Sequence, residues 1–188
     1  MTFEEVMTKV HPVSSETALS DEEAQLLWEC VSQIPLGSTA LEIGCQLGRS
    51  SVLIANVAHS HQFHTIHIDP HTQQEEYAAG WMKHMKTSLP EGAVFTALVM
   101  RTDQAALILQ KLGPYAFAYI DGDHEYPGVM IDLRVAASRV VIGGTICCHD
   151  YGRDSLPGVW QAVNEFMQSG DWELIRVAGT MGAWRRLR

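Results

Sequence analysis

Two aspartates, a histidine and a glutamate are crowded into residues 119–126, which read YIDGDHEY. Asp121 and His124 stand just after an apolar run typical of a buried strand. A carboxylate there can hold a cation, and a histidine, with an ordinary pKa of about 6.5, can accept a proton near neutral pH. The alternative is a helix-capping turn, with Asp123 as the N-cap and Glu125 near the positive helix end.

Polar groups also follow four other apolar runs along the chain. In chain order they are Glu42, Gly44, Gln46, Gly48 and Ser50, then Asp69, then Thr102 and Asp103, and finally His149 and Asp150. Glycines in the first group allow a tight turn and a close approach of the backbone to a ligand. Asp69 follows Gly48 by about twenty residues, a spacing that suits the two hydroxyls of a ribose. Because the carboxyl ends of parallel strands meet at one edge of a sheet, we expect all these groups on one rim.

The elements that must position these residues are predicted from apolar periodicity and turn residues. Strands are expected at residues 39–45, 63–69, 93–100, 116–121 and 139–150, and helices at 48–59, 73–89, 103–113, 127–138 and 156–170. A further helix at 19–35 has Ser20 as a plausible N-cap and Glu23 three residues on, the capping-box pattern. Five strand-then-helix units predict an α/β fold with a doubly wound, mostly parallel sheet and helices on both faces.

The two ends of the chain depart from this alternation. Residues 172–187 are expected to form two more strands around a glycine-containing turn, which adds an antiparallel hairpin and completes a seven-stranded sheet. Residues 1–20 precede the regular pattern and are interpreted as an N-terminal appendage to one domain at 21–188.

Composition narrows the classes of partner. The 188 residues are 46% hydrophobic and 19% charged, which is typical of a soluble globular domain. A formal charge of −9 argues against a nucleic-acid partner. The sequence contains neither an apolar run long enough for a membrane span nor a secretory signal. Four cysteines without metal-binding spacing indicate buried thiols and a cytoplasmic protein. The apolar segment 159–167 leaves a homodimer open.

These motifs resemble those of the class I S-adenosylmethionine-dependent methyltransferases, and more closely the metal-dependent O-methyltransferases of the catechol and macrolide-sugar types. The resemblance runs from about Ser20 onward and is most specific at residues 41–51, 120–133 and 143–166. It implies a Rossmann-like fold and methyl transfer from S-adenosylmethionine to a hydroxyl oxygen of a small molecule. A divalent metal, magnesium or manganese, would assist.

The resemblance also implies roles for individual residues. Its cofactor-binding residues are Glu42, Gly44, Gln46, Gly48 and Ser50 near the methionine end, Asp69 at the ribose, Thr102 and Asp103 near the adenine, and Asp121. Asp121, His149 and Asp150 match the metal ligands, so that Asp121 would also act in catalysis. His124 falls where the macrolide-sugar enzymes have a histidine base and the catechol enzymes a lysine.

Two positions depart from the pattern of this family. Gln46 replaces the middle glycine of the usual GxGxG loop. His149 stands where relatives tend to carry a carboxylate, and magnesium prefers oxygen ligands. Either a metal that accepts imidazole, such as manganese or iron, binds here, or only Asp121 and Asp150 are ligands.

Two other functional classes remain as alternatives. A nicotinamide-dependent oxidoreductase would share the sheet and Asp69, but Gly44 and Gly48 do not match its GxGxxG fingerprint. A non-catalytic protein that binds the cofactor and serves in assembly would have no need of Asp121 and His124.

Overall fold

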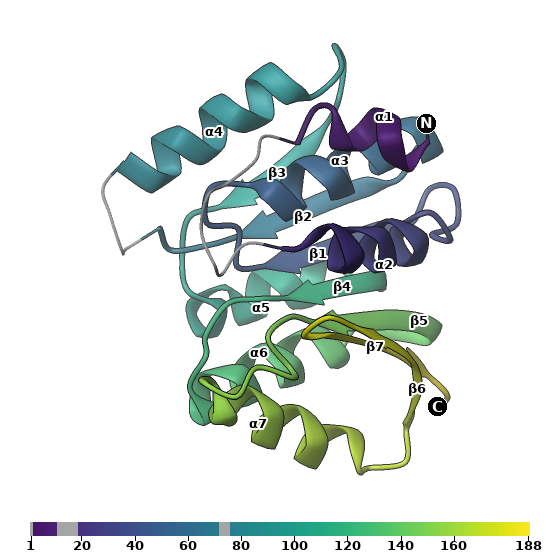
Figure 1. Cartoon of the computed structure of the whole chain (residues 1–188), viewed down its shortest axis with the longest axis vertical. Coiled ribbons are helices and arrows are strands. Elements are labelled where there is room, and N and C mark those ends of the chain that lie inside the picture. The colour runs from purple at the N-terminus through teal and green to yellow at the C-terminus, as the bar shows by residue number, and fades with distance from the viewer. Residues whose placement is uncertain (1, 11–18, 72–75) are drawn as a thin grey trace.

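The computed structural model describes residues 2–10, 19–71 and 76–188. Within these residues seven strands form one sheet in the order β3-β2-β1-β4-β5-β7-β6 (Figure 1). The strands are β1 (Thr39–Ile43), β2 (His64–Ile68), β3 (Phe95–Leu98), β4 (Tyr115–Ile120), β5 (Val140–Cys148), β6 (Trp172–Ala178) and β7 (Met181–Arg186). The first five are parallel, and β7 runs antiparallel to both β5 and β6. The predicted doubly wound sheet with a closing hairpin is confirmed.

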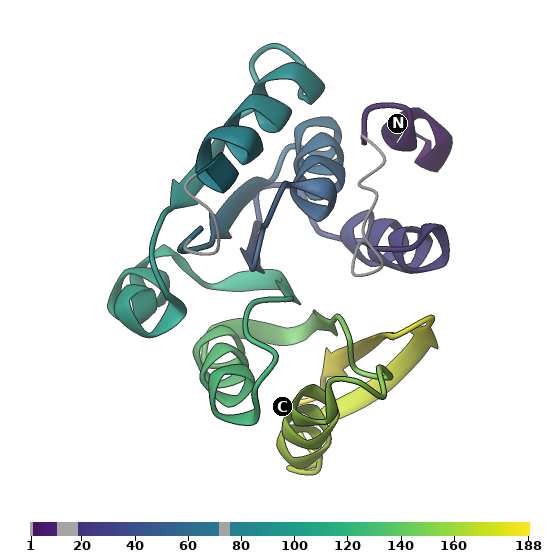
Figure 2. The same ribbon diagram turned by 60° about the vertical axis from the view of Figure 1, so that its left-hand side comes forward.

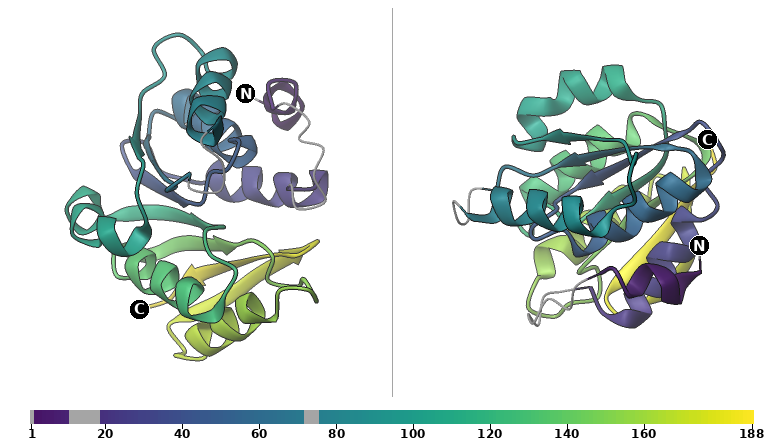
Figure 3. Two further views of the ribbon diagram at one scale, coloured as in Figure 1. Left: turned by 90° about the vertical axis from the view of Figure 1, so that its left-hand side faces the viewer. Right: turned by 90° about the horizontal axis from the view of Figure 1, so that it is seen from above.

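Helices cover both faces of the sheet, as the two turned views show (Figures 2 and 3). They are α1 (Phe3–Met7), α2 (Asp21–Val31), α3 (Arg49–His61), α4 (Glu76–Ser88), α5 (Thr102–Leu112), α6 (Tyr126–Ala137) and α7 (Pro157–Met167). The first four contribute side chains to one apolar cluster, and the last three contribute to a second cluster on the opposite face. Strands buried on both sides explain why most of them are continuous apolar runs.

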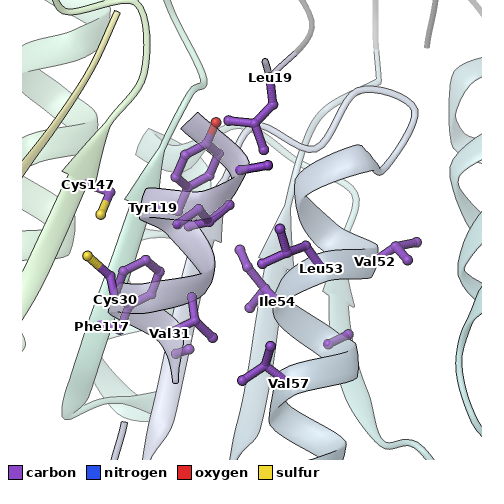
Figure 4. Packing of buried hydrophobic residues seen from close by; sticks show 14 of the residues in the cluster. Leu19, Cys30, Val31, Val52, Leu53, Ile54, Val57, Phe117, Tyr119 and Cys147 are labelled. Carbon is purple, nitrogen blue, oxygen red and sulfur yellow. The ribbon is translucent and has the colours of Figure 1, made fainter. Parts of the chain in front are cut away.

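The first cluster joins α2 and α3 to the middle of the sheet. Figure 4 shows Val31 of α2 and Ile54 of α3 near Phe117 of β4. The predicted capping box begins α2, because the Ser20 Oγ accepts a hydrogen bond from the Glu23 amide and the Ser20 amide donates to Glu23 Oε2. This local device sets where α2 starts and therefore where the Glu23 side chain can reach.

Part of the segment expected as an appendage is packed onto the domain. Val6 of α1 is buried in the first cluster, and Lys9 donates a hydrogen bond to Asn56 Oδ1 of α3 at 3.1 Å. Residues 11–18 lie outside the described residues. None of the helices in the described part of the chain is both long and apolar enough to cross a membrane.

Candidate active site

A cavity of about 380 Å³ opens at the carboxyl ends of the parallel strands. Ten of the predicted site residues line it: Gly44, Gln46, Gly48, Ser50, Asp69, Thr102, Asp103, Asp121, His124 and Asp150. The expectation of one shared rim is therefore confirmed for these positions. The cavity wall does not include Glu42 or His149, and their surroundings explain why.

The loop from β1 to α3 forms one side of the cavity and depends on its glycines. Gly44 has φ +88°, and a Cβ on it would lie 1.9 Å from the backbone oxygen of Asp121. Gly48 has φ +89° and is the N-cap of α3. Only glycine adopts such a φ freely and leaves room for the neighbouring strand end. Gln46 also has a positive φ, 43°, so a side chain is tolerated at the departure from GxGxG.

Asp69 at the end of β2 holds this loop. Its Oδ2 accepts hydrogen bonds from the amides of Cys45 at 2.8 Å and Gln46 at 2.9 Å, and its Oδ1 accepts one from the His71 amide at 2.6 Å. The acidic residue therefore organises the loop by itself, before any ligand is considered. Its predicted contact with a ribose stays a prediction.

Glu42 points away from the cavity. Side chains alternate along a strand, so Glu42 shares the face of Ala40, which packs in the cluster under α3 and α4. Its Oε2 accepts a hydrogen bond from Ser51 Oγ at 2.6 Å and lies 2.5 Å from Nδ1 of His67, its direct neighbour on β2. Glu42 is completely buried, and the structure does not bring it to the other predicted cofactor residues.

The ends of β4 and β5 bring together the predicted base and the predicted metal ligands. His124 Nε2 lies 3.3 Å from Asp150 Oδ2 and 3.8 Å from Asp121 Oδ1. His149 Nδ1 lies 3.2 Å from the same oxygen of Asp121 and 3.7 Å from Asp150 Oδ2. Arg153 donates a hydrogen bond to the other oxygen of Asp150 at 3.2 Å. The two carboxylates on the cavity wall are thus both in contact with His124 and His149, and Asp150 also binds Arg153.

The turn before α6 differs from the helix-capping alternative. The N-cap of α6 is Glu125, which makes no side-chain cap, and not Asp123. Asp123 Oδ1 instead accepts a hydrogen bond from the Glu125 amide at 2.8 Å, within a turn that precedes the helix. This turn leaves His124 on the cavity wall, with its side chain partly exposed.

Glu23 was predicted only as part of the capping box, but it also contacts residues near the active site. Its Oε2 lies 3.4 Å from His149 Nε2, and its Oε1 accepts hydrogen bonds from the amide and the hydroxyl of Thr180 at 2.7 and 2.8 Å. The capping pattern predicted only the contact with Ser20, because a residue far away in sequence leaves no local signal. One carboxylate therefore connects the start of α2, the end of β5 and the β6–β7 turn.

The charges of this corner stabilise one another. Hydrogen bonds to Asp121 and Asp150 raise the pKa of His124 to about 10. Burial by itself would lower the pKa of His149, but Asp121 and Glu23 outweigh it and raise that pKa to about 10. Burial would likewise raise the pKa of Asp121, yet the two histidines lower it below its ordinary value. Without a bound cation, the surrounding carboxylates therefore favour the imidazolium form of both histidines.

Asp132 of α6 is a second residue that the sequence analysis missed. It lines the cavity, is only 4% exposed and accepts a hydrogen bond from the Asp123 amide at 3.3 Å. Burial raises its pKa to about 6, against the opposing effect of hydrogen bonds from Thr102 and from the Asp123 amide. The only signal in the sequence is an acidic residue inside an otherwise apolar stretch of helix.

The donor atoms of Asp121, His149 and Asp150 fit a divalent metal. One ligand atom from each residue lies within 4.8 Å of the other two, and His149 and Asp150 are buried. Two carboxylate oxygens with one imidazole nitrogen are donors for manganese or iron rather than for magnesium, which prefers oxygen alone. The donor chemistry is thus compatible with the predicted metal and favours one that accepts nitrogen.

Several solved structures of O-methyltransferases share the fold of this chain. Among solved structures, an O-methyltransferase from Bacillus cereus in complex with S-adenosylhomocysteine is 13% identical, with a TM-score of 0.72 and coverage of 98% of this chain and 90% of that one. The O-methyltransferase TomG from Streptomyces achromogenes, from tomaymycin synthesis and in complex with S-adenosylmethionine, is 16% identical, with a TM-score of 0.68 and coverage of 99% and 89%. CalS11, a TDP-rhamnose 3′-O-methyltransferase from calicheamicin biosynthesis, is 14% identical, with a TM-score of 0.70 and coverage of 97% and 92%.

At these identities the structural likeness establishes the fold, and the family rests on the sequence. Residues 41–151, more than half of the chain, match the family model of a methyltransferase domain. This segment includes the glycine loop, Asp69, His124 and both metal-ligand candidates at the end of β5. The match favours a methyltransferase over the nicotinamide-dependent oxidoreductases, and the resemblance seen in the sequence is confirmed. The chain therefore belongs to this family of methyltransferase domains.

Proposed function

We propose that the protein transfers the methyl group of S-adenosylmethionine to a hydroxyl oxygen of a small molecule. The observation that carries this proposal is the position of His124, Asp121 and Asp150 on the wall of the same cavity that the glycine loop borders. The acceptor oxygen would attack the methyl carbon while the carbon–sulfur bond breaks. The products are a methyl ether, S-adenosylhomocysteine and one proton.

The chain's own residues divide into a cofactor side and an acceptor side. Gly44 allows the loop to pack against the Asp121 backbone and Gly48 allows it to pack against Trp81, so that the loop and the start of α3 border the cavity where the methionine end is proposed to lie. Thr102 and Asp103 begin α5 on the other side of the cavity, where the adenine is proposed to lie. Holding oxygen, methyl and sulfur in line supplies most of the rate enhancement, because it replaces a collision by a fixed geometry.

His124 is proposed to receive the proton of the acceptor hydroxyl. Its position beside Asp121 and Asp150 supports this role, but the same carboxylates raise its pKa and favour its protonated form when no cation is present. A dication held by Asp121, His149 and Asp150 would lower the pKa of an acceptor hydroxyl and offset the carboxylate charge that retains the His124 proton. Oxygen as the acceptor atom is further supported by the structural neighbours, which are named as O-methyltransferases.

The test begins with cofactor binding. Calorimetric titration of the full chain with S-adenosylmethionine and with S-adenosylhomocysteine is expected to give micromolar dissociation constants. Radiolabelled methyl transfer is then measured with a panel of sugars and catechols, with manganese and with EDTA. Asp121→Ala should abolish metal-dependent transfer, whereas Glu91→Ala, at an exposed turn, should leave it unchanged. Absence of cofactor binding, or an active Asp121→Ala enzyme, would overturn the proposal. Tight cofactor binding without transfer to any acceptor would favour a non-catalytic binding protein.

A further inference from the structure

His149 stands between an acidic pair on one side and a single buried carboxylate on the other. Its Nδ1 lies 3.2 Å from Asp121 Oδ1 and 3.7 Å from Asp150 Oδ2, and its Nε2 lies 3.4 Å from Glu23 Oε2. The His149 side chain is only 3% exposed, so water cannot substitute freely for these partners. In a neutral histidine that donates its Nε2–H to a carboxylate, the Nδ1 lone pair is directed to the opposite side of the ring.

We propose that Glu23 is the positioning residue of a metal site that accepts nitrogen. It holds the Nε2–H of His149, so that Nδ1 joins Asp121 and Asp150 as a ligand, and this donor set selects Mn²⁺ or Fe²⁺ over Mg²⁺. Metal-bound histidines in proteins generally donate their second ring N–H to a carboxylate or carbonyl, which orients the ring and raises its basicity. The inference rests on the proposed function, because it concerns the metal of the same site.

The Glu23 carboxylate is held firmly enough to orient another side chain. Oε1 is bound by the amide and hydroxyl of Thr180, and Oε2 is bound by the Ser20 amide at 2.7 Å. Gly179 leaves the space for it, because a Cβ there would lie 2.7 Å from Glu23 Oε1. With three partners besides His149, the carboxylate keeps its place without the imidazole and can therefore dictate which way the ring faces.

The choice of metal follows from the donor set. Magnesium requires near-ideal octahedral oxygen coordination and loses its water reluctantly, whereas manganese and iron accept imidazole nitrogen readily. His149 therefore lowers the affinity for magnesium relative to an all-carboxylate site. Glu23 strengthens this effect, because a hydrogen-bonded imidazole is a better nitrogen donor.

Metal binding to the full chain, measured by calorimetry without acceptor, tests the inference. The wild type is expected to bind Mn²⁺ at least tenfold more tightly than Mg²⁺, and Glu23→Gln to lose about tenfold or more of the Mn²⁺ affinity. Glu22→Gln, an exposed neighbour on the same helix, should behave as the wild type. Ser20→Ala removes part of the same cap and should lower thermal stability while leaving the Mn²⁺/Mg²⁺ ratio unchanged. Equal losses of that ratio in Ser20→Ala and Glu23→Gln would show a merely structural role and overturn the proposal.

A spectroscopic signature identifies the ligand atom. Pulsed electron paramagnetic resonance of bound Mn²⁺ should show coupling to a histidine nitrogen that persists in His124→Gln and disappears in His149→Asn. His149→Asp makes all three ligands carboxylates and should bind Mg²⁺ more tightly than the wild type does. If the added charge prevents this variant from folding, the loss of nitrogen coupling in His149→Asn still tests the inference. Absence of nitrogen coupling in the wild type, or equal affinity for both metals, would overturn the inference.

The two proposals fail in distinguishable ways. S-adenosylmethionine binding and methyl transfer are measured on the same preparation. If both persist without any preference for Mn²⁺, this inference is wrong and the proposed function stands. If the wild type binds no S-adenosylmethionine while nitrogen-coupled Mn²⁺ is present, the function is wrong and the metal site stands.

Discussion

Two clusters of carboxylate and histidine lie at the ends of the parallel strands, and they differ in access rather than in composition. In the closed cluster, Glu42 and His67 face Ser51 under α3 and α4, and all three are buried. In the open cluster, Asp121, His124 and Asp150 border the cavity, while His149 and Glu23 lie behind them. Even the donor atoms of Glu42, Cys45 and His67 lie within 4.8 Å of one another, as those of the open cluster do.

The comparison teaches that residue types and spacing alone do not distinguish a structural pair from a reactive site. The closed cluster is sealed by the apolar side chains around it. Glu42 Oε2 contacts His67 Nδ1 at 2.5 Å, whereas Glu42 Oε1 is buried without a hydrogen-bond partner among the described residues. In the open cluster the carboxylates of Asp121 and Asp150 contact two imidazoles and the Arg153 guanidinium, and they also border a cavity from which a ligand can enter. Its charges are therefore available to a cation or a substrate.

The largest expected effect on stability comes from disturbing the close approach of Gly44 to the Asp121 backbone, beside the open cluster. Gly44→Ala should lower the free energy of unfolding by about 3–6 kcal/mol, because a Cβ would meet the Asp121 backbone and the positive φ adds strain. Gly92→Ala is the matched control, since Gly92 has φ +83° but nothing within 4 Å of its Cβ position. Urea denaturation should show the smaller loss there, about 1–2 kcal/mol from strain alone. Equal losses in both variants would contradict a role for the close approach.

The next largest effect is expected from a substitution in the closed cluster, which should change stability but not ligand binding. Glu42→Gln should cost about 3 kcal/mol of stability, because it breaks a buried pair and removes the carboxylate that His67 and Ser51 both contact. It should hardly change the affinity for S-adenosylmethionine or Mn²⁺, since Glu42 is not on the cavity wall. Calorimetry and urea denaturation of the same variant check both statements. A large loss of cofactor affinity at unchanged stability would instead support the cofactor role that the sequence resemblance implied.

A third change acts on the chemistry of the open cluster. His124→Gln should lower the rate of methyl transfer by about 100-fold, equal to about 2.7 kcal/mol of transition-state stabilisation, because the proton acceptor is removed. S-adenosylmethionine affinity should stay within a few-fold, which calorimetry can verify. His59→Gln, on the exposed end of α3, serves as the control for a histidine outside the cavity. An unchanged rate in His124→Gln would remove this residue from the proposed mechanism.

The smallest expected effect concerns Asp132, a lone carboxyl group that belongs to neither cluster. Burial raises its pKa to about 6 in the folded state, so its stabilising contribution is complete below about pH 4 and is lost as the pH rises through 6. Asp132→Asn should therefore be more stable than the wild type at pH 7 by about 1–2 kcal/mol, with no such advantage at pH 4. Urea denaturation across this range checks the sign, with Asp154→Asn as an exposed control. A stability difference that does not depend on pH would contradict the assigned pKa.

Much of the candidate site could be predicted because each strand end carries its own polar signal. Gly44 and Gly48 follow an apolar run, and Asp121 and His124 follow another, so the fold class alone brings them to one rim. Glu42 was expected there too, since it belongs to the same motif. Because side chains alternate along β1, the Glu42 side chain lies on the sheet face that α3 and α4 cover. The motif itself does not indicate which residues of the strand end will face the cavity.

The sequence by itself determined the elements from α2 onward, their order and the start of α2 at Ser20, because periodicity and capping act between residues close in the chain. Only the tertiary structure decided that Glu23 reaches His149, which is 126 residues away, and that Glu42 closes on His67. Which carboxylate faces a cavity depends on how the strand ends and helices pack around it. That packing is a property of the whole sheet, so no local pattern can encode it.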